Sequence, residues 1–335
     1  MSYRTLGRSG LEVSPLTLGA MMFGGQTDAS SARRIIDSAF DQGINFIDTA
    51  DVYNAGQSEV IVGQAIAARR DDWVLASKVG MGPADGPANG RGLGRKHILR
   101  SVEASLRRLG TDYLDLYYLH REDHQTPLEE SISAIGDLIR QGKVRYWGLS
   151  NYRGWRIAEV VHIAERLGVD RPVASQPLYN LVNRQAEVEQ ITAAAFHGLG
   201  VVPYSPLARG VLSGKYRPGE APASDSRAGR QDKRILETEW RDESLRIAQR
   251  VKEYAEQRGV GVVEFAIAWV LNNAAVSSAI VGPRTEEQWA TYVRALGLRL
   301  TAEDEAFVDG LVTPGHASTP GYNDPTHFVS GRWPR

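Results

Sequence analysis

Hydrophobic residues along this chain follow two different spacings. Short apolar runs, such as residues 74–76, are typical of buried strands. Between these runs lie stretches with apolar residues three and four positions apart, such as Ala32, Ile35, Ile36 and Ala39, which predict amphipathic helices. Many of these stretches stop at a glycine, a common residue just past a helix end. The pattern therefore predicts alternating strands and helices.

The alternation yields eight strands, each followed by helical sequence. The expected strands cover residues 16–20, 45–48, 73–78, 114–120, 144–150, 173–176, 201–204 and 278–281. The expected helices cover residues 28–42, 58–68, 96–109, 128–140, 155–167, 187–196, 243–258, 262–272 and 286–296. A short hairpin over residues 3–13 precedes them, and long loops are expected at 80–94 and 205–240.

Strict alternation favours parallel strands, because antiparallel neighbours need no crossover helix. Eight such units suit a closed α/β barrel. An open doubly wound sheet would place a G-x-G-x-x-G turn after its first strand, but residues 19–25 do not have that spacing. We therefore expect a single (β/α)8 TIM barrel domain over residues 1–335. It should have an N-terminal β-hairpin, long loops at its C-terminal mouth and an extended tail over residues 313–335.

Composition narrows the function classes. The 39 basic and 40 acidic residues nearly cancel, which gives no electrostatic case for nucleic acid or an anionic membrane as partner. The absence of cysteine excludes disulfides, thiolate metal sites and a cysteine nucleophile. The first ten residues lack a signal peptide's apolar segment, and no apolar run approaches the roughly 20 residues that span a bilayer. The expectation is a soluble, cytoplasmic protein without a metal site.

Polar residues at the expected strand ends suggest chemistry, because active sites of such barrels gather there. Asp48 ends the second strand, Lys78 ends the third, His120 ends the fourth, and Tyr53 follows in the second loop. Singly, each has a structural explanation, such as a turn aspartate, a surface lysine or a core histidine. Together they form a coherent acid–base set, because a lysine lowers the pKa of a neighbouring phenol from about 10 and a carboxylate keeps that lysine charged.

Residues 43–53, Gly-Ile-Asn-Phe-Ile-Asp-Thr-Ala-Asp-Val-Tyr, resemble the signature of the aldo-keto reductase family. Four further segments resemble other motifs of that family and occur in the same order and spacing: residues 119–120, 148–151, 204–207 and 280–284. The similarity extends from residue 3 to about residue 300. Residues 23–26 and 92–98 resemble the branch that holds potassium-channel β subunits and bacterial sugar-phosphate or aldehyde reductases.

The resemblance implies a catalytic tetrad of Asp48, Tyr53, Lys78 and His120. In it, Tyr53 protonates the carbonyl oxygen, Lys78 lowers the pKa of Tyr53, Asp48 pairs with Lys78, and His120 orients the carbonyl. The channel subunits carry Asn where this chain has His120, so the histidine favours a working enzyme.

The resemblance also implies an NADP(H) site. The residues expected to contact the cofactor are Ser150, Asn151, Gln176, Tyr204, Ser205, Leu207, Gly210, Lys215, Arg227, Gly282, Arg284 and Gln288. The first four are expected at the nicotinamide, the next five around the phosphates and the last three at the adenosine end. Arg284 suits a 2′-phosphate, because its planar fork binds pairs of oxygens. One departure is that Thr291 and Tyr292 stand where the family usually has Glu and Asn.

The predicted function is reversible NADPH-dependent reduction of small aldehydes, ketones or sugar-derived carbonyls. Two alternatives remain open. One is an NADP(H)-binding regulatory or redox-sensing subunit with weak turnover, and the other is a barrel hydrolase or isomerase in which paired acids act. The related branch includes tetramers and larger rings, so the resemblance is compatible with a homo-oligomer.

Overall fold

The computed structural model describes residues 2–82 and 86–325, and the chain divides into two compact units. The barrel unit comprises residues up to 178 together with 189–204 and 273–293. The second unit comprises residues 179–188 and 205–272 and the chain from 294 onward. The expectation of one domain over the whole chain stays a prediction.

The barrel unit contains an eight-stranded parallel sheet, as predicted. Its strands, in spatial order, are β10 (Ala279–Val281), β3 (Leu16–Gly19), β4 (Phe46–Asp48), β5 (Val74–Val79), β6 (Leu114–Leu119), β7 (Val144–Ser150), β8 (Ala174–Gln176) and β9 (Gly200–Val201). Parallel bridges join Val201 to Val276 and Tyr204 to Ile280, so the two edges of the sheet meet. The (β/α)8 fold is therefore confirmed.

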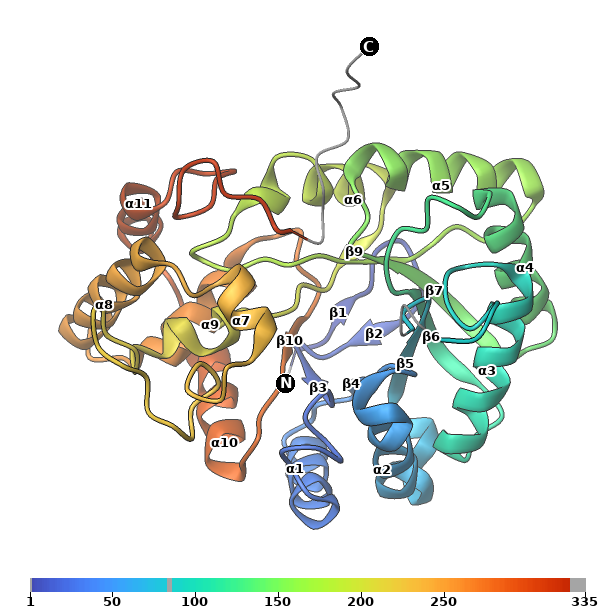
Figure 1. Ribbon diagram of the computed structural model, residues 1–335, viewed down its shortest axis with the longest axis horizontal. Coiled ribbons are helices and arrows are strands. Elements are labelled where there is room, and N and C mark those ends of the chain that lie inside the picture. Colours follow the sequence, from blue (N-terminus) through green and yellow to red (C-terminus); the bar gives the residue numbers. More distant parts are fainter. Residues whose placement is uncertain (1, 83–85, 326–335) are drawn as a thin grey trace. The chain divides into compact units, whose positions relative to one another are not determined.

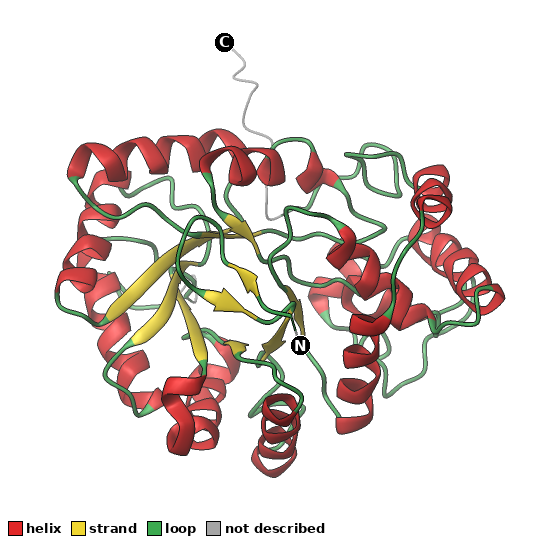
Figure 2. Cartoon of the chain, turned by 180° about the vertical axis from the view of Figure 1, so that it is seen from behind, coloured by secondary structure: helices red, strands yellow, loops and turns green. Residues whose placement is uncertain are grey.

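Helices follow the strands and surround them (Figure 2). In the barrel unit they are α1 (Ala29–Asp41), α2 (Gln57–Ile66), α3 (Arg95–Leu109), α4 (Leu128–Arg140), α5 (Gly154–Leu167) and α6 (Gln190–His197), with α10 (Glu286–Arg294) after β10 (Figure 1). Helix α1 shows why the spacing was predictive, because Ala32, Ile35, Ile36 and Ala39 all lie on its buried face. The Asp28 side chain caps this helix by accepting a hydrogen bond from Ser31 N–H at 2.9 Å.

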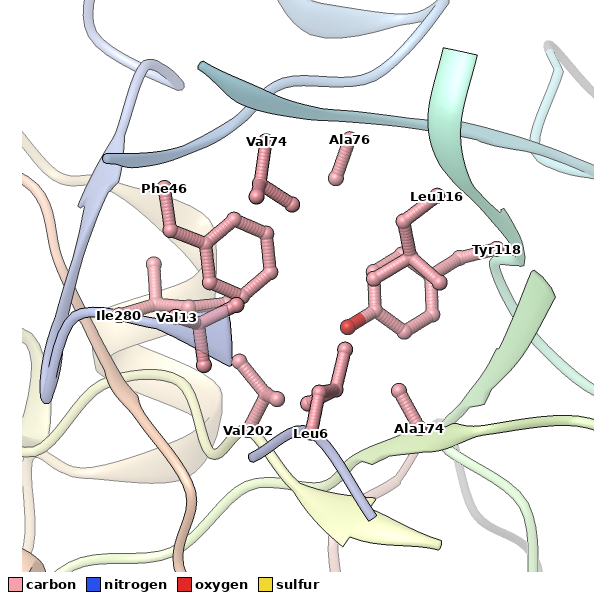
Figure 3. Packing of buried hydrophobic residues seen from close by; sticks show 10 residues of the cluster. All are labelled: Leu6, Val13, Phe46, Val74, Ala76, Leu116, Tyr118, Ala174, Val202 and Ile280. Atoms are coloured by element: carbon pink, nitrogen blue, oxygen red, sulfur yellow. The ribbon is translucent and has the colours of Figure 1, made fainter. Parts of the chain in front are cut away.

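Apolar side chains fill the barrel interior (Figure 3). Phe46, Val74, Leu116 and Tyr118 point inward from the three strands β4, β5 and β6 and meet Leu6, which lies beside strand β1 (Arg4–Thr5) of the hairpin. The hairpin partner, β2 (Glu12–Val13), contributes the fully buried Val13 to the same cluster. Burying each such large side chain contributes roughly 1.5–3 kcal/mol, so the barrel is a packed core rather than a pore.

The second unit is helical. Its helices are α7 (Lys233–Thr238), α8 (Asp242–Gln257), α9 (Val262–Asn272) and α11 (Ala302–Leu311). Two parts of this unit differ from the sequence prediction. The expected loop at 205–240 contains a 3₁₀ helix (Ala208–Ser213) and α7, and α11 was not expected. The overlooked signal for α11 is a capping box, in which Thr301 and Asp304 exchange side-chain and backbone hydrogen bonds.

Two other boundaries have simple causes. Strand β9 is shorter than predicted, since Pro203 has no N–H to continue the ladder. Residues 313–325 contain no helix or regular strand and consist mainly of turns and bends. The extended tail stays a prediction, and its residues 326–335 lie outside the described residues. Among the helices of residues 2–82 and 86–325, none combines the length and apolar character needed to cross a membrane.

Candidate active site

Three neighbouring strands bring the predicted acid–base residues to one end of the barrel. Asp48 is the last residue of β4, Lys78 is the second-to-last residue of β5, and His120 directly follows β6. Strands β4, β5 and β6 are adjacent and parallel, so their carboxyl ends lie at the same edge. Tyr53 begins a 3₁₀ helix in the loop after β4. All four residues belong to the barrel unit.

Lys78 is the centre of this group and is fully buried. Its ammonium forms an ion pair with Asp48, donates to the carbonyl oxygen of Thr49 at 2.7 Å, and lies 3.3 Å from the hydroxyl of Tyr53. Burial opposes the charged form, but the Asp48 carboxylate and Tyr53 more than compensate and raise the pKa of Lys78. A buried ammonium is therefore held next to the phenol oxygen.

The backbone around Tyr53 is strained. Asn54 and Ala55, which follow it, have φ of 48° and 54°, a region that side chains other than glycine rarely adopt. The amide of Asn54 holds this turn by donating to the carbonyl oxygens of Met21 and Phe23 at 2.9 and 2.8 Å. Strain of this kind persists only where the surroundings enforce it, and it is concentrated at functional sites. Here the strained turn directly follows Tyr53.

His120 is neutral in this environment. It is almost completely buried, and burial together with the positive charges of Lys78 and Arg121 places its pKa well below the ordinary value. Its ring lies edge-on to that of Tyr53, with 5.9 Å between the centroids. Nδ1 is buried and has no hydrogen-bond partner among the described residues. Since an unpaired buried N–H is costlier than an unpaired acceptor, we place the imidazole proton on Nε2.

The four residues predicted at the nicotinamide form one hydrogen-bond network. Tyr204 OH donates to Asn151 Oδ1 at 2.8 Å, and Asn151 Nδ2 contacts both the carbonyl oxygen of His120 and Ser150 Oγ at 3.0 Å. Ser150 Oγ donates to the carbonyl oxygen of Gln176 at 3.1 Å. The Gln176 amide in turn donates to Asp48 Oδ2 at 3.0 Å. The structure therefore brings these residues together and links them to the acid–base group.

The predicted adenosine-end residues lie after β10, in the barrel unit. Arg284 N–H donates to Gln288 Oε1 at 2.8 Å, and Thr27 Oγ1 donates to the carbonyl oxygen of Arg284 at 3.1 Å. The Arg284 guanidinium is partly exposed and only 3.4 Å from Gln26 Oε1. Gly282, two residues before Arg284, is exposed. These contacts fix the backbone and, among the residues that the structure describes, leave most of the guanidinium's donors without a protein partner.

The two residues that depart from the family pattern lie on α10. The Thr291 hydroxyl donates to the carbonyl oxygen of Glu287 at 2.9 Å, one turn back in the same helix. Burial raises the pKa of Tyr292 to about 12, and the positive charge of Arg284 opposes this shift. Tyr292 is thus an uncharged aromatic near Arg284, where the family usually has a polar amide.

The remaining predicted residues lie in the second unit. Left-handed backbone recurs there at Ser205, Ala208, Arg209 and Gly210, with φ from 46° to 100°. The loop is fixed by Asn180, whose amide donates to the carbonyl oxygen of Ser205 at 3.1 Å, and by Gly210 N–H, which donates to the carbonyl oxygen of Leu207 at 2.8 Å. A methyl group added at Gly210 would lie 3.6 Å from the Lys215 ammonium, so these two residues are close.

Arg209, which lies near the predicted residue Arg227, was missed by the sequence prediction. Burial and the neighbouring positive charge of Arg209 lower the pKa of Arg227, and Asp232, 3.1 Å away, opposes the shift. Two guanidinium groups near each other form a site suited to an anion. The available signal was the position of Arg209, since a basic residue between Leu207 and Gly210 lies inside the stretch predicted to surround phosphates.

The model of the aldo/keto reductase family matches residues 15–313 of this chain. The chain belongs to the aldo/keto reductase family. A probable voltage-gated potassium channel subunit beta of Oryza sativa subsp. japonica is 39% identical over 329 residues, which cover 96% of this chain and all of that protein. An uncharacterized oxidoreductase of Bacillus subtilis (strain 168), YrpG, is 41% identical over 314 residues, covering 90% of this chain and 93% of that protein. A probable voltage-gated potassium channel subunit beta of Arabidopsis thaliana is 41% identical over 302 residues, covering 88% and 91%.

Family membership supports an oxidoreductase, and it confirms the resemblance found in the motifs. It also favours an oxidoreductase over the hydrolase or isomerase alternative. Within residues 2–82 and 86–325, no three histidine, aspartate or glutamate side chains gather closely enough to hold a metal ion.

Proposed function

We propose that this aldo/keto reductase reversibly reduces small carbonyl compounds to alcohols with NADPH, using Tyr53 as the general acid. The observation that carries the proposal is the buried Lys78 ammonium, held between the Asp48 carboxylate and the Tyr53 hydroxyl. An ammonium at 3.3 Å stabilises the phenolate that remains when Tyr53 gives up its proton. No other buried lysine in the described chain has this arrangement.

Each residue of the group has a distinct task in this proposal. Tyr53 donates its proton to the substrate oxygen during reduction and removes it from the alcohol in the reverse direction. Neutral His120 donates a hydrogen bond from Nε2 to the same oxygen and orients the carbonyl. Asp48 keeps Lys78 charged, and Gln176 holds the second oxygen of that carboxylate. When bound, the nicotinamide supplies the hydride that the carbonyl carbon receives.

Each unit, taken by itself, has donor groups of the kind that bind parts of a dinucleotide. The Arg209 and Arg227 guanidinium groups provide positive charge for phosphates, and Lys215 adds an exposed ammonium near Gly210. In the barrel unit, Ser150, Asn151 and Gln176 offer hydroxyl and amide groups of the kind that bind a carboxamide. Arg284 has donors available for a 2′-phosphate. Preference for NADPH, the substrate classes named above, a cytoplasmic location and oligomer formation remain proposals.

Replacement of Tyr53 by Phe tests the function. The variant keeps the ring and removes the proton donor, so NADPH-dependent reduction of a panel of aldehydes and ketones should fall by about 10²–10⁴-fold. Tyr113→Phe is the matched control, because the Tyr113 hydroxyl donates to the surface carboxylate of Asp71 at 2.7 Å, its hydrogen-bond partner within the described residues. Unchanged turnover in Tyr53→Phe would exclude the proposed general acid.

The channel subunits among the relatives favour a second candidate, a nucleotide-binding subunit that acts through a partner protein. This candidate predicts tight NADPH binding, seen as a change in nicotinamide fluorescence, with negligible turnover of every carbonyl tested. Measuring NADPH binding and carbonyl turnover of the wild-type protein therefore separates the two candidates.

A further inference from the structure

One short helix of the second unit contacts both arginines that are proposed to bind phosphates. This helix is α7, Lys233–Thr238 (Figure 1). At its N-terminal end, Asp232 forms an ion pair with Arg227, with 3.1 Å between Oδ2 and Nε. At its C-terminal end, the hydroxyl of Thr238 accepts a hydrogen bond from Arg209 Nε at 3.2 Å. A displacement of α7 would therefore move both guanidinium groups.

The two residues of these contacts are fixed to the backbone of α7 itself. The other carboxylate oxygen of Asp232 accepts a hydrogen bond from Ile235 N–H at 3.0 Å, which caps the helix. The Thr238 hydroxyl donates to the carbonyl oxygen of Arg234, one turn back. Ile235 and Thr238 are fully buried, so the helix is packed into the second unit. Asp232 and Thr238 therefore keep their positions only as long as α7 keeps its own.

The C-terminal segment holds α7 through an ion pair. The Arg234 guanidinium donates to both carboxylate oxygens of Asp324, at 3.3 and 2.7 Å. Two parallel hydrogen bonds between a guanidinium and a carboxylate fix the relative orientation of the two groups as well as their distance. Asp324 is only 6% exposed, so solvent screens this pair less than a surface pair. We call this contact between Asp324 and Arg234 the tail latch.

The segment that carries Asp324 is itself anchored within the second unit. The Gln185 amide donates to the carbonyl oxygen of Tyr322 at 2.8 Å. The guanidinium of Arg241 lies over the Tyr322 ring, with 3.9 Å between its central carbon and the ring centroid, which is a cation–π contact. Asp324 therefore extends from a supported stretch of chain, and the tail latch ties α7 to that support.

The two phosphate arginines need such a support because their charges repel each other. Burial and the positive charge of Arg209 lower the pKa of Arg227. Without a bound anion, this repulsion favours separation of the two groups, and their contacts with α7 oppose it. A scaffold that holds like charges together before the anion arrives reduces the free energy that binding must supply. The affinity for phosphate groups thus depends on how firmly α7 is held.

We propose that Asp324 is a positioning residue for cofactor binding, because the tail latch holds α7 where Arg209 and Arg227 meet the phosphates. The proposal rests on the NADP(H) site proposed above and not on the identity of the carbonyl substrate. Since NADPH and NADH share the pyrophosphate, the latch strengthens the binding of both cofactors. Proton transfer by Tyr53 does not depend on it.

The substitution Asp324→Asn removes the charge of the latch with almost no change in shape. NADPH should bind roughly 3–10-fold more weakly, as expected for a residue that affects a site through other residues. Most of this loss should appear as faster release of NADPH, because changes within one interface act mainly on dissociation. The KM for NADPH should rise, while the KM for the carbonyl should not change.

The experiment measures the dissociation constant and the release rate of NADPH by nicotinamide fluorescence. It compares wild type, Asp324→Asn, Asp324→Glu, Arg209→Gln and the double variant Asp324→Asn with Arg209→Gln. Thr319→Val is the matched control, because the Thr319 hydroxyl lies in the same segment but donates to Glu243 of α8, at 3.0 Å, and not to α7. Urea unfolding of each variant at pH 7 shows whether it is folded.

Support requires weaker NADPH binding in Asp324→Asn, recovery toward wild type in Asp324→Glu and no change in Thr319→Val. The effect of Asp324→Asn must also be smaller in the Arg209→Gln background, because the latch acts through Arg209. An equal effect in both backgrounds assigns a merely structural role to Asp324 and overturns the proposal. An equal loss in Thr319→Val would likewise overturn it, since any loosening of the tail would then suffice.

An unchanged dissociation constant in folded Asp324→Asn also overturns the proposal. If that variant does not fold, Arg234→Gln breaks the same ion pair and gives the same readings. The failure of the proposed function is recognised separately, because the fluorescence needs no turnover. Weaker NADPH binding in Asp324→Asn, in a protein whose wild type reduces no carbonyl, would leave the tail latch intact and reject the proposed function alone. A wild type that does not bind NADPH would overturn both.

Discussion

The Nε2 of Gln176, at the end of β8, donates a hydrogen bond of 3.0 Å to Oδ2 of Asp48, at the end of β4. The two residues are 128 positions apart and both are buried. The other oxygen of Asp48 pairs with Lys78. Asp48 thus joins Lys78 to the hydrogen-bond network of Ser150, Asn151 and Tyr204.

Loss of the Asp48 charge should destabilise the fold strongly. Asp48→Asn leaves the Lys78 ammonium fully buried without its counter-ion, and breaking a buried pair in this way costs about 3–5 kcal/mol. Urea unfolding at pH 7 measures the loss. Glu165→Gln is the control, because it removes an exposed ion pair with Arg171 and should cost less than about 1 kcal/mol. Equal losses in the two variants would contradict the assigned pairing.

Asp51 should make stability depend on pH. Its pKa is about 7 in the folded protein and about 3.9 when unfolded, so between these values the folded state binds the additional proton. Stability should therefore decrease as pH rises from about 4 to 7, by up to roughly 4 kcal/mol for a shift of about three units.

The substitution Asp51→Asn isolates this contribution. It should make the protein more stable than wild type at pH 8 and change stability little at pH 4, because the native carboxyl is neutral there. The difference in urea midpoint between the two proteins, followed from pH 4 to 9, provides the measurement. A constant difference across that range would show that Asp51 does not titrate there.

Gly148 in β7 should not tolerate a larger residue. A methyl group at this position would lie 2.7 Å from Cε1 of the buried Tyr118 ring and 2.8 Å from the carbonyl oxygen of Ala174. Gly148→Ala should lower the unfolding free energy by about 1–3 kcal/mol through overpacking. Gly10→Ala should be nearly neutral, since no atom lies within 4 Å of the added methyl. A thermal unfolding comparison that found no difference would contradict the packing described.

Arg284 should determine the preference between the two nicotinamide cofactors. Arg284→Ala removes a charged hydrogen-bonding group, so NADPH should bind about 10–100-fold more weakly while NADH binding stays the same. Fluorescence titration with both cofactors gives the ratio. Arg33→Ala, which removes an exposed cation of α1, should leave both affinities unchanged. Parallel losses for NADPH and NADH would instead assign Arg284 to a contact shared by the two.

Much of this protein is determined locally in its sequence. The 3.6-residue spacing on α1 and the short apolar runs gave the alternating elements, and alternation alone restricts the strands to parallel pairing. The expected residues Asp48, Lys78 and His120 could be named because parallel strands place their carboxyl ends at one edge. The capping box of α11 was equally local, although its meaning was not recognised.

Other features depended on contacts that no local pattern contains. The sequence does not reveal that Gln176 contacts Asp48, that Arg209 lies near Arg227, or that Tyr118 occupies the space left by Gly148. Nor does it reveal that the half-buried Asp51 feels the charge of Glu59. The charge of a carboxyl or ammonium depends on its desolvation and its neighbours, and both arise only when distant segments pack together. The sequence by itself therefore determined which residues meet at the barrel end, while the tertiary structure decided their protonation and support.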